Sequence, residues 1–162
     1  MLASFDDISE VISIYHNLIG TPGCTWSLDY PTIEIVKADI ESRSLYILKD
    51  DSRIIAVAAA GAFDELNHLQ WKLRNLCELA RIGVISTMQR QGIGTLILQN
   101  VINAVKAKGF DGIRMLVSKT NPAALALYKR NGFERCGETF IFNIHFYCYQ
   151  LVFERDKVYF RV

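Results

Sequence analysis

Residues 77–118 have the pattern of a strand, a helix and a second strand in direct succession. The apolar stretch CELARIGVI at 77–85 is typical of a strand, and so is GIRMLVSK at 112–119. Between them, a helical periodicity starts at Gly92 and ends at Gly109, a residue type that suits a helix C-terminus. The apolar positions of its stripe are Ile93, Leu96, Ile97, Val101, Ala104 and Val105. Two strands joined through a helix run parallel, so we expect a sheet with helices packed on it.

The rest of the chain predicts three more helices and two antiparallel hairpins. The helices are expected over 8–19, 31–43 and 121–132, and the hairpins over 44–50 with 53–63 and over 133–141 with 145–154. These elements predict an α/β (α+β) fold with a single mixed, mostly antiparallel central sheet of six to seven strands, flanked by about four helices. No linker or repeat divides the chain, so residues 1–162 are expected to form one domain.

Local signals refine these boundaries. Ser4 and Asp7 have the spacing of a capping box before the first helix. Pro31 is expected at the first position of the second helix, where its missing N–H costs nothing. The segment 64–76 has two readings, a short helix or an irregular excursion.

Composition excludes several classes of function. The net charge of +1 gives no overall field toward nucleic acid or an anionic membrane. The longest apolar run, at 54–63, is too short to span a bilayer, and the acidic N-terminus lacks the order of a signal peptide. The cysteines, Cys24, Cys77, Cys136 and Cys148, are scattered, as are the three histidines. We therefore expect no metal site, four reduced thiols and a cytoplasmic protein.

The glycine pair at the start of the central helix indicates a phosphate site. The Rossmann pattern fails because Ile97 stands at the place of its third glycine, and the chain has no Walker A lysine motif. QRQGIG instead matches [QR]-x-x-G-x-[GA] through Gln89, Gly92 and Gly94. A helix N-terminus offers free amides and about half a positive charge, and Arg90 can add a charged hydrogen bond. The alternative is an ordinary glycine-rich turn that starts a helix.

Two motifs together carry a family resemblance. ELARIGVISTMQRQGIGTLIL and, one strand later, NPAALALYKRNGFE resemble the GNAT superfamily of acyl-CoA-dependent N-acetyltransferases. The resemblance to the core of that family covers residues 44–137. The family usually opens with a strand before its first helix, and here only MLAS is available, so that strand is expected to be short or absent.

The resemblance implies acetyl-CoA, or a related acyl-CoA, as the cofactor. Its pyrophosphate would be held by the backbone amides of Gln89, Arg90, Gln91, Gly92, Ile93, Gly94 and Thr95. Its pantetheine arm would pair with the strand at Ile82, Gly83 and Val84, through backbone donors on Ile82 and Val84. Gly83 is expected to mark a bulge that opens this strand away from the next. Asn121 would contact the cofactor, or cap the helix that begins at Pro122, or do both.

Acetyl transfer to an amine needs a base for the ammonium proton and is helped by an acid for the thiolate. Tyr128 occupies the tyrosine position of the second motif and is the candidate acid; the alternative is an aromatic that packs its helix on the sheet. Glu78 lies fourteen residues before Gly92, the separation that the resemblance implies for the glutamate base of histone acetyltransferases in this superfamily, and is the candidate base. Its alternative is an ion pair with Arg81 or another cation, and a water chain could replace it as base.

The acceptor site is expected between the first inter-helix loop, the segment before 77–85 and the last hairpin. Its candidate residues are Trp26, Asp29, Tyr30, Trp71, His68 and His145. Aromatics there would suit a small amine with an apolar body, and Asp29 could attract its charge; the alternative is simple packing. The aromatic last hairpin could also pair edges in a homodimer.

These residues predict an N-acetyltransferase that moves an acetyl group from acetyl-CoA to a primary amine, of a small molecule or a peptide, by direct attack in a ternary complex. The alternative is a non-catalytic acyl-CoA-binding regulatory module. We expect no nucleic acid and no membrane among its partners.

Overall fold

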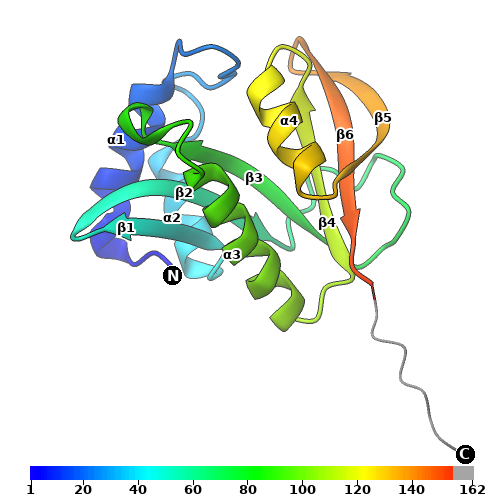
Figure 1. The fold of residues 1–162 in the computed structure, drawn as a ribbon, viewed down its shortest axis with the longest axis horizontal. Helices are drawn as coiled ribbons and strands as arrows, with labels where there is room; N and C mark the ends of the chain where they lie inside the picture. Colours follow the sequence, from blue (N-terminus) through cyan, green and yellow to red (C-terminus); the bar gives the residue numbers. More distant parts are fainter. Residues whose placement is uncertain (155–162) are drawn as a thin grey trace, which may run out of the picture.

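The computed structural model describes residues 1–154 of the chain (Figure 1). Its helices are α1 (Ile8–Leu18), α2 (Ile33–Glu41), α3 (Ile93–Ala107) and α4 (Pro122–Arg130), with short 3-10 turns η1 (Phe5–Asp7) and η2 (Ser86–Met88). Its strands are β1 (Leu45–Asp50), β2 (Arg53–Gly61), β3 (Leu76–Val84), β4 (Gly112–Ser118), β5 (Glu134–Ile141) and β6 (Ile144–Val152). Within these residues, no helix is long and apolar enough to cross a membrane.

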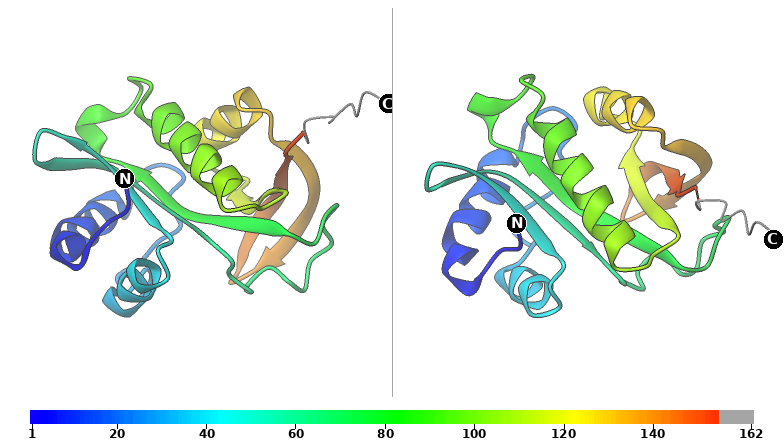
Figure 2. Two further views of the ribbon diagram at one scale, coloured as in Figure 1. Left: turned by 90° about the horizontal axis from the view of Figure 1, so that it is seen from below. Right: turned by 60° about the horizontal axis from the view of Figure 1, so that its bottom comes forward.

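All six strands form one sheet in the order β1-β2-β3-β4-β6-β5. Only β3 and β4 are parallel, and the other neighbours are antiparallel. Helices α1 and α2 cover one face, while α3 and α4 cover the other (Figure 2). The expected mixed, mostly antiparallel sheet with about four helices is confirmed. The strand, helix and strand predicted within residues 77–118 are confirmed as β3, α3 and β4.

A hydrophobic core lies on each face of the sheet. On one face, α1 and α2 pack through Val11, Tyr15 and Val36 onto β1 and β2. On the other, Ile97 and Leu98 of α3 lie in a cluster with residues of α4 and of all three central strands; its strand members include Ala58, Cys77, Leu79, Ile113 and Met115. Because strand side chains alternate between faces, the residues between these positions, among them Glu78 and Arg114, point to the α1–α2 face.

The N-terminal residues replace the missing first strand. Leu2 forms an isolated antiparallel bridge with Tyr46, and Ala3 N–H donates to Leu45 O at 2.9 Å. The pairing ends there, because Ser4 N–H already donates to Asp7 Oδ2 at 2.8 Å and starts η1. The expectation of a short first strand and a Ser4–Asp7 capping interaction is confirmed.

The structure corrects the start of the second helix. Pro31 follows a cis peptide bond and precedes the helix, which begins at Ile33. The N-cap is Thr32, whose hydroxyl accepts a hydrogen bond from Ile35 N–H at 3.3 Å. The first N–H groups of a helix have no partner within the helix, and the Thr32 hydroxyl satisfies one of them. This cap therefore sets the start of the helix at Ile33. The ambiguous segment 64–76 is an irregular excursion of turns that leads into β3, and it contains no helix.

A bulge separates the two halves of β3. Between Val57↔Gly83 and Ala59↔Ala80, β3 has one residue more than β2, and Arg81 takes a left-handed φ of 50°. The sequence assigned this bulge to Gly83, but the bulged backbone is at Arg81, two residues earlier in the strand. Gly83 lacks a side chain for a different reason, because a Cβ there would lie 2.7 Å from Leu18 Cδ1.

Candidate active site

Strands β3 and β4 part after three register positions. Leu76, Cys77 and Glu78 pair with Gly112, Ile113 and Arg114, and no pairing follows toward the carboxyl ends of the strands. The far edge of β3, from Leu79 to Val84, therefore faces a gap where a neighbouring strand would lie (Figure 1). The expected splay of this strand from the next is confirmed.

The backbone of Ile82 and Val84 faces this gap. Ile85 N–H donates to Ile55 O of the β2 side at 3.0 Å, and hydrogen-bonding direction alternates along a strand. Val84 O, on the opposite side, accepts from Gln89 Nε2 at 3.0 Å. An extended ligand arm could add to β3 here as an extra strand, as the sequence predicts.

The turn 89–92 leads from β3 into α3 with free backbone donors. Gly92 is the N-cap at φ 81°, and Arg90 is also left-handed at φ 62°. The first hydrogen bond into the helix is Leu96 N–H to Gly92 O at 3.0 Å. Among residues 1–154, the amides of residues 89–95 have no hydrogen-bond acceptor. A Cβ on Gly92 would meet nothing within 4 Å, so the space in front of these amides is open. The residues present fit a pyrophosphate.

Three elements meet beside this turn. A Cβ built on Gly94 would lie 3.4 Å from Leu127 Cδ2 of α4 and 4.0 Å from Val84 Cγ2 of β3. The start of α3, the end of β3 and the middle of α4 therefore border the same gap. Val84 and Gly94, two of the residues predicted to contact the cofactor, therefore lie beside Leu127, the residue before Tyr128.

Tyr128 is the buried aromatic of α4. It is 2% exposed and packs edge-on against Phe133, with ring centroids 5.5 Å apart. Burial raises the pKa of its phenol, so the group stays protonated at neutral pH. Among the described residues, its hydroxyl has no hydrogen-bond partner, but its oxygen is not fully buried. Packing and a free O–H are thus both present.

Asn121 is the N-cap of α4, which is one of the two roles that the sequence predicted for it. Its Oδ1 accepts from Ala124 N–H at 3.1 Å, and its Nδ2 donates to Gly23 O of the α1–α2 loop at 3.4 Å. A Cβ on Gly23 would lie 2.6 Å from the Asn121 side chain, so this loop approaches α4 closely. The contact joins the two sides of the gap.

Glu78 is a buried carboxylate at the base of the splay. Its side chain is 3% exposed, and Oε2 lies 3.6 Å from Arg114 Nη2 without forming a hydrogen bond. Burial, helped by the charge of Glu65, raises the pKa of Glu78 to about 7, although Arg114, Arg81 and a backbone hydrogen bond from Leu66 act in the opposite direction. A carboxylate with this pKa can accept a proton near neutral pH.

Arg81 is not the partner of Glu78. Its guanidinium pairs with Asp39 of α2, with Nη2 2.8 Å from Oδ2, and Nη1 donates to Tyr30 Oη at 3.0 Å. The cation beside Glu78 is Arg114, which sequence analysis did not single out. An arginine inside the apolar stretch GIRMLVSK was the available signal, since a buried charge needs a counter-charge.

The α1–α2 loop brings three candidate acceptor residues to β3. Trp26 packs edge-on against Tyr15 at 5.0 Å between centroids, and its Cη2 lies 3.3 Å from the position of a Cβ on Gly83. Tyr30 is held by Arg81, while Asp29 is exposed. This loop therefore lies over the outer half of β3, on the α1–α2 face.

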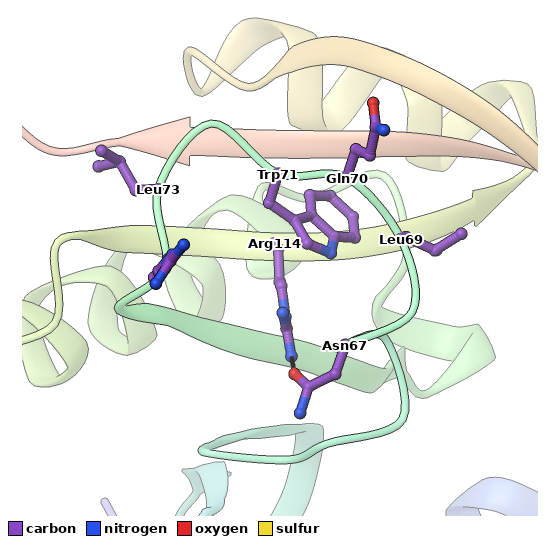
Figure 3. Close-up of a pocket in the computed structure, with 7 residues that line it drawn as sticks. Asn67, Leu69, Gln70, Trp71, Leu73 and Arg114 are labelled. Carbon is purple, nitrogen blue, oxygen red and sulfur yellow. Dashed lines mark hydrogen bonds between the residues drawn. The ribbon is translucent and has the colours of Figure 1, made fainter.

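The excursion 64–75 carries a separate candidate, Trp71. Its indole N–H donates to Leu66 O at 2.9 Å, and its ring stacks on the Arg114 guanidinium at 5.7 Å (Figure 3). His68 is exposed on the same segment. His145 stacks on Phe140 at 4.4 Å near the tip of the β5–β6 hairpin and is also exposed. Trp71 alone among these three contacts the charged residues around Glu78.

The opened strand pair and the unpaired amides at the start of α3 are two features that the resemblance to an acyltransferase family implied. The chain belongs to the acetyltransferase (GNAT) family, whose sequence model matches residues 11–133. The resemblance inferred from its motifs is therefore confirmed.

Relatives in sequence match only part of the chain. N-acetyltransferase family 8 member 3 of Mus musculus is 33% identical over 63 residues, which are 39% of this chain and 28% of that protein. The rat member 3 is 31% identical over 67 residues, 41% of this chain and 29% of the relative. The chain thus matches under a third of the length of these curated relatives.

Solved structures share the whole fold. A GNAT-family acetyltransferase from Streptococcus agalactiae superposes with a TM-score of 0.79 at 17% identity, covering 96% of this chain and 95% of that one. The ribosomal-protein-alanine N-acetyltransferase of Brucella melitensis gives 0.76 at 19% identity, covering 94% and 98%. At such identities, the similarity concerns the fold.

Proposed function

We propose that this chain transfers an acetyl group from acetyl-CoA to a primary amine, by direct attack within a ternary complex. One observation carries the proposal: the unpaired amides of residues 89–95 and the open edge of β3 border a single gap. Acetyl-CoA, when bound there, supplies an acetyl group activated as a thioester. The pyrophosphate would contact the amides from Gln89 to Thr95, and its extended arm the backbone of Ile82 and Val84.

The proposed proton carriers lie on opposite faces of the sheet. Glu78 points to the α1–α2 face, and Tyr128 belongs to the core under α3 and α4. Since β3 and β4 separate just beyond Glu78, we propose that the acceptor amine and the thioester meet in the gap between them. Glu78 Oε2 accepts a proton from the acceptor ammonium; the Tyr128 hydroxyl gives its proton to the departing thiolate and regains one from the acceptor nitrogen as the amide forms. Burial favours the protonated form of Tyr128, so the hydroxyl carries its proton at neutral pH.

The acceptor is proposed to enter over the α1–α2 face, between the loop of Trp26, Asp29 and Tyr30 and the excursion of Trp71. Two solved neighbours are named as N-acetyltransferases of ribosomal-protein alanine, which supports a protein or peptide amine as the acceptor; a small-molecule amine is the other acceptor that we propose. We further propose a single domain that works in the cytoplasm, with its cysteines free; all four are free in the structure. Pairing through the β5 edge in a homodimer is part of the same proposal.

A regulatory acyl-CoA-binding module is the alternative, because it would use the same turn. Titration calorimetry with CoA and a thiol-release assay over a panel of amines separate the two. Binding together with acetylation of at least one amine supports the enzyme. Binding with no acetylation of any amine favours the module, and failure to bind CoA removes both.

A further inference from the structure

A cavity of about 510 Å³ lies beneath the excursion 64–75, on the α1–α2 face of β4 (Figure 3). Its lining consists of two guanidinium groups, two amides, an indole and two leucines, from Arg74, Arg114, Asn67, Gln70, Trp71, Leu69 and Leu73. None of these lining residues is acidic. The cavity therefore combines a positive charge with apolar walls, which suits an anionic group attached to an apolar body.

Arg114 has one nitrogen left for a ligand. Nη2 donates to Asn67 Oδ1 at 2.6 Å and to Phe63 O at 3.2 Å, and it is the atom nearest Glu78. Nε is fully buried without a partner. Nη1 also has no acceptor within the described residues, but unlike Nε it is not fully buried. Because Arg114 lines the cavity, Nη1 is the donor presented to its contents.

The local charges leave Arg114 only partly compensated. Its ion-pair distance to Glu78 is 3.6 Å with no hydrogen bond, whereas Arg81 and Asp39 make bidentate contacts at 3.0 and 2.8 Å. Arg74 adds a second cation, and the described residues give it no acceptor. A planar guanidinium binds a carboxylate through two hydrogen bonds, and Arg114 Cζ lies 5.7 Å from the centroid of the Trp71 ring.

The cavity is also close to the proposed chemistry. Arg114 pairs in register with Glu78 at the last bonded position before β3 and β4 separate. A molecule that reaches Arg114 from the cavity therefore lies one side chain away from the proposed base, at the foot of the gap.

We propose that the acceptor carries a carboxylate as well as its amine, as in an amino acid or a short peptide, and that Arg114 and Arg74 bind this carboxylate in the cavity. This inference rests on the proposed acetyl transfer. It goes further by assigning the acceptor's charge, and it moves recognition from Asp29 on the α1–α2 loop to the opposite excursion. Trp71, Leu69 and Leu73 then contact the apolar part of the acceptor.

Matched acceptor pairs test the proposal. Each apolar amino acid is compared with its decarboxylated amine, for example leucine with 3-methylbutylamine and phenylalanine with 2-phenylethylamine, at saturating acetyl-CoA. We expect kcat/KM to favour at least one amino acid by about tenfold or more, the scale of one hydrogen bond to a charged group. Arg74→Gln should remove this preference while the rate with the decarboxylated amine stays unchanged. Arg53→Gln, an exposed arginine on β2 away from the cavity, is the matched control.

Two results overturn the proposal. One is a kcat/KM for the decarboxylated amine that equals or exceeds that for the amino acid in every pair; the other is a preference for the amino acid that persists in Arg74→Gln. If no amine is acetylated, the proposed function fails, and binding then decides the inference alone. In a Trp26→Phe background Trp71 is the remaining tryptophan. Its fluorescence should respond saturably to leucine and not to 3-methylbutylamine; the absence of a response to any amino acid overturns the site.

Discussion

Glu78 and Arg114 face each other at the point where β3 and β4 separate, with Glu78 Oε2 3.6 Å from Arg114 Nη2. The pair is buried, but it is too long for a hydrogen bond. Arg114 donates instead to Asn67 and Phe63, so it attracts the Glu78 carboxylate without donating a hydrogen bond to it. This arrangement leaves the carboxylate poised between its charged and neutral forms, as a base at neutral pH requires.

The rate should therefore depend on the ionisation of Glu78. With an amine acceptor, kcat should fall as the pH drops below about 7, where Glu78 becomes protonated. Glu78→Gln should lower kcat by about 100-fold or more and abolish this acid limb, because it removes the proton acceptor. Steady-state rates between pH 5.5 and 9 measure both effects. A variant that retains the wild-type rate and pH profile would show that water takes the proton.

Glu78 should also affect stability in a pH-dependent way. Its pKa of about 7 in the folded protein exceeds its ordinary 4.5, so between these values the unfolded chain has lost a proton that the folded protein keeps. The free energy of unfolding should therefore fall by up to about 3 kcal/mol from pH 4.5 to pH 7 and then level off. Urea titrations of wild type and Glu78→Gln isolate this contribution as the difference in slope. Parallel slopes would contradict it.

Tyr128→Phe should separate catalysis from packing. The ring stays against Phe133, and within residues 1–154 no hydrogen bond is lost, so the melting temperature should hold. We expect kcat to fall about tenfold or more while the KM for acetyl-CoA is unchanged, because only the proton for the thiolate is removed. An unaltered kcat would leave Tyr128 a packing residue.

Gly92 and Gly109 offer a matched pair at the two ends of α3. Both have a positive φ, 81° and 87°, and a Cβ on either would meet nothing within 4 Å. Gly92→Ala and Gly109→Ala should thus each cost about 1 kcal/mol of stability from the left-handed backbone. Only Gly92→Ala should weaken CoA binding, since its methyl group enters the space before the free amides. Calorimetry with CoA is the measurement, and equal affinities for the two variants would count against the phosphate site.

The Arg81–Asp39 pair should be a major source of stability, because both side chains are almost fully buried. Asp39→Ala leaves the Arg81 guanidinium without its counter-charge, at a cost of about 3–5 kcal/mol. The comparison is Glu138→Ala, which breaks an ion pair of similar length, 2.6 Å to Lys119, on the surface. We expect no measurable loss there, because water and salt screen exposed charges. Chemical denaturation of the two variants should differ accordingly; equal losses would refute the argument.

The sequence by itself determined the elements and the position of the turn whose amides are unpaired. Apolar periodicity located α1, α3, α4 and all six strands, and the positions of Gly92 and Gly94 identified the start of α3 as the exposed donor site. These are local properties, since helix caps, turns and strand alternation depend on neighbours within a few residues. The one helix start that was wrong, at Pro31, was decided by the side chain of Thr32, the residue directly before Ile33.

Only the tertiary structure decided which charges meet. Glu78 faces Arg114, 36 positions along the chain, and Arg81 reaches Asp39 instead, 42 positions before it. Sequence spacing cannot rank such partners, because the register of β3 on β4 and the bulge at Arg81 fix where each long side chain points. The cavity beneath Trp71 arises in the same way: an irregular segment with no periodicity folds over a buried arginine, and the two are adjacent only after the sheet has formed.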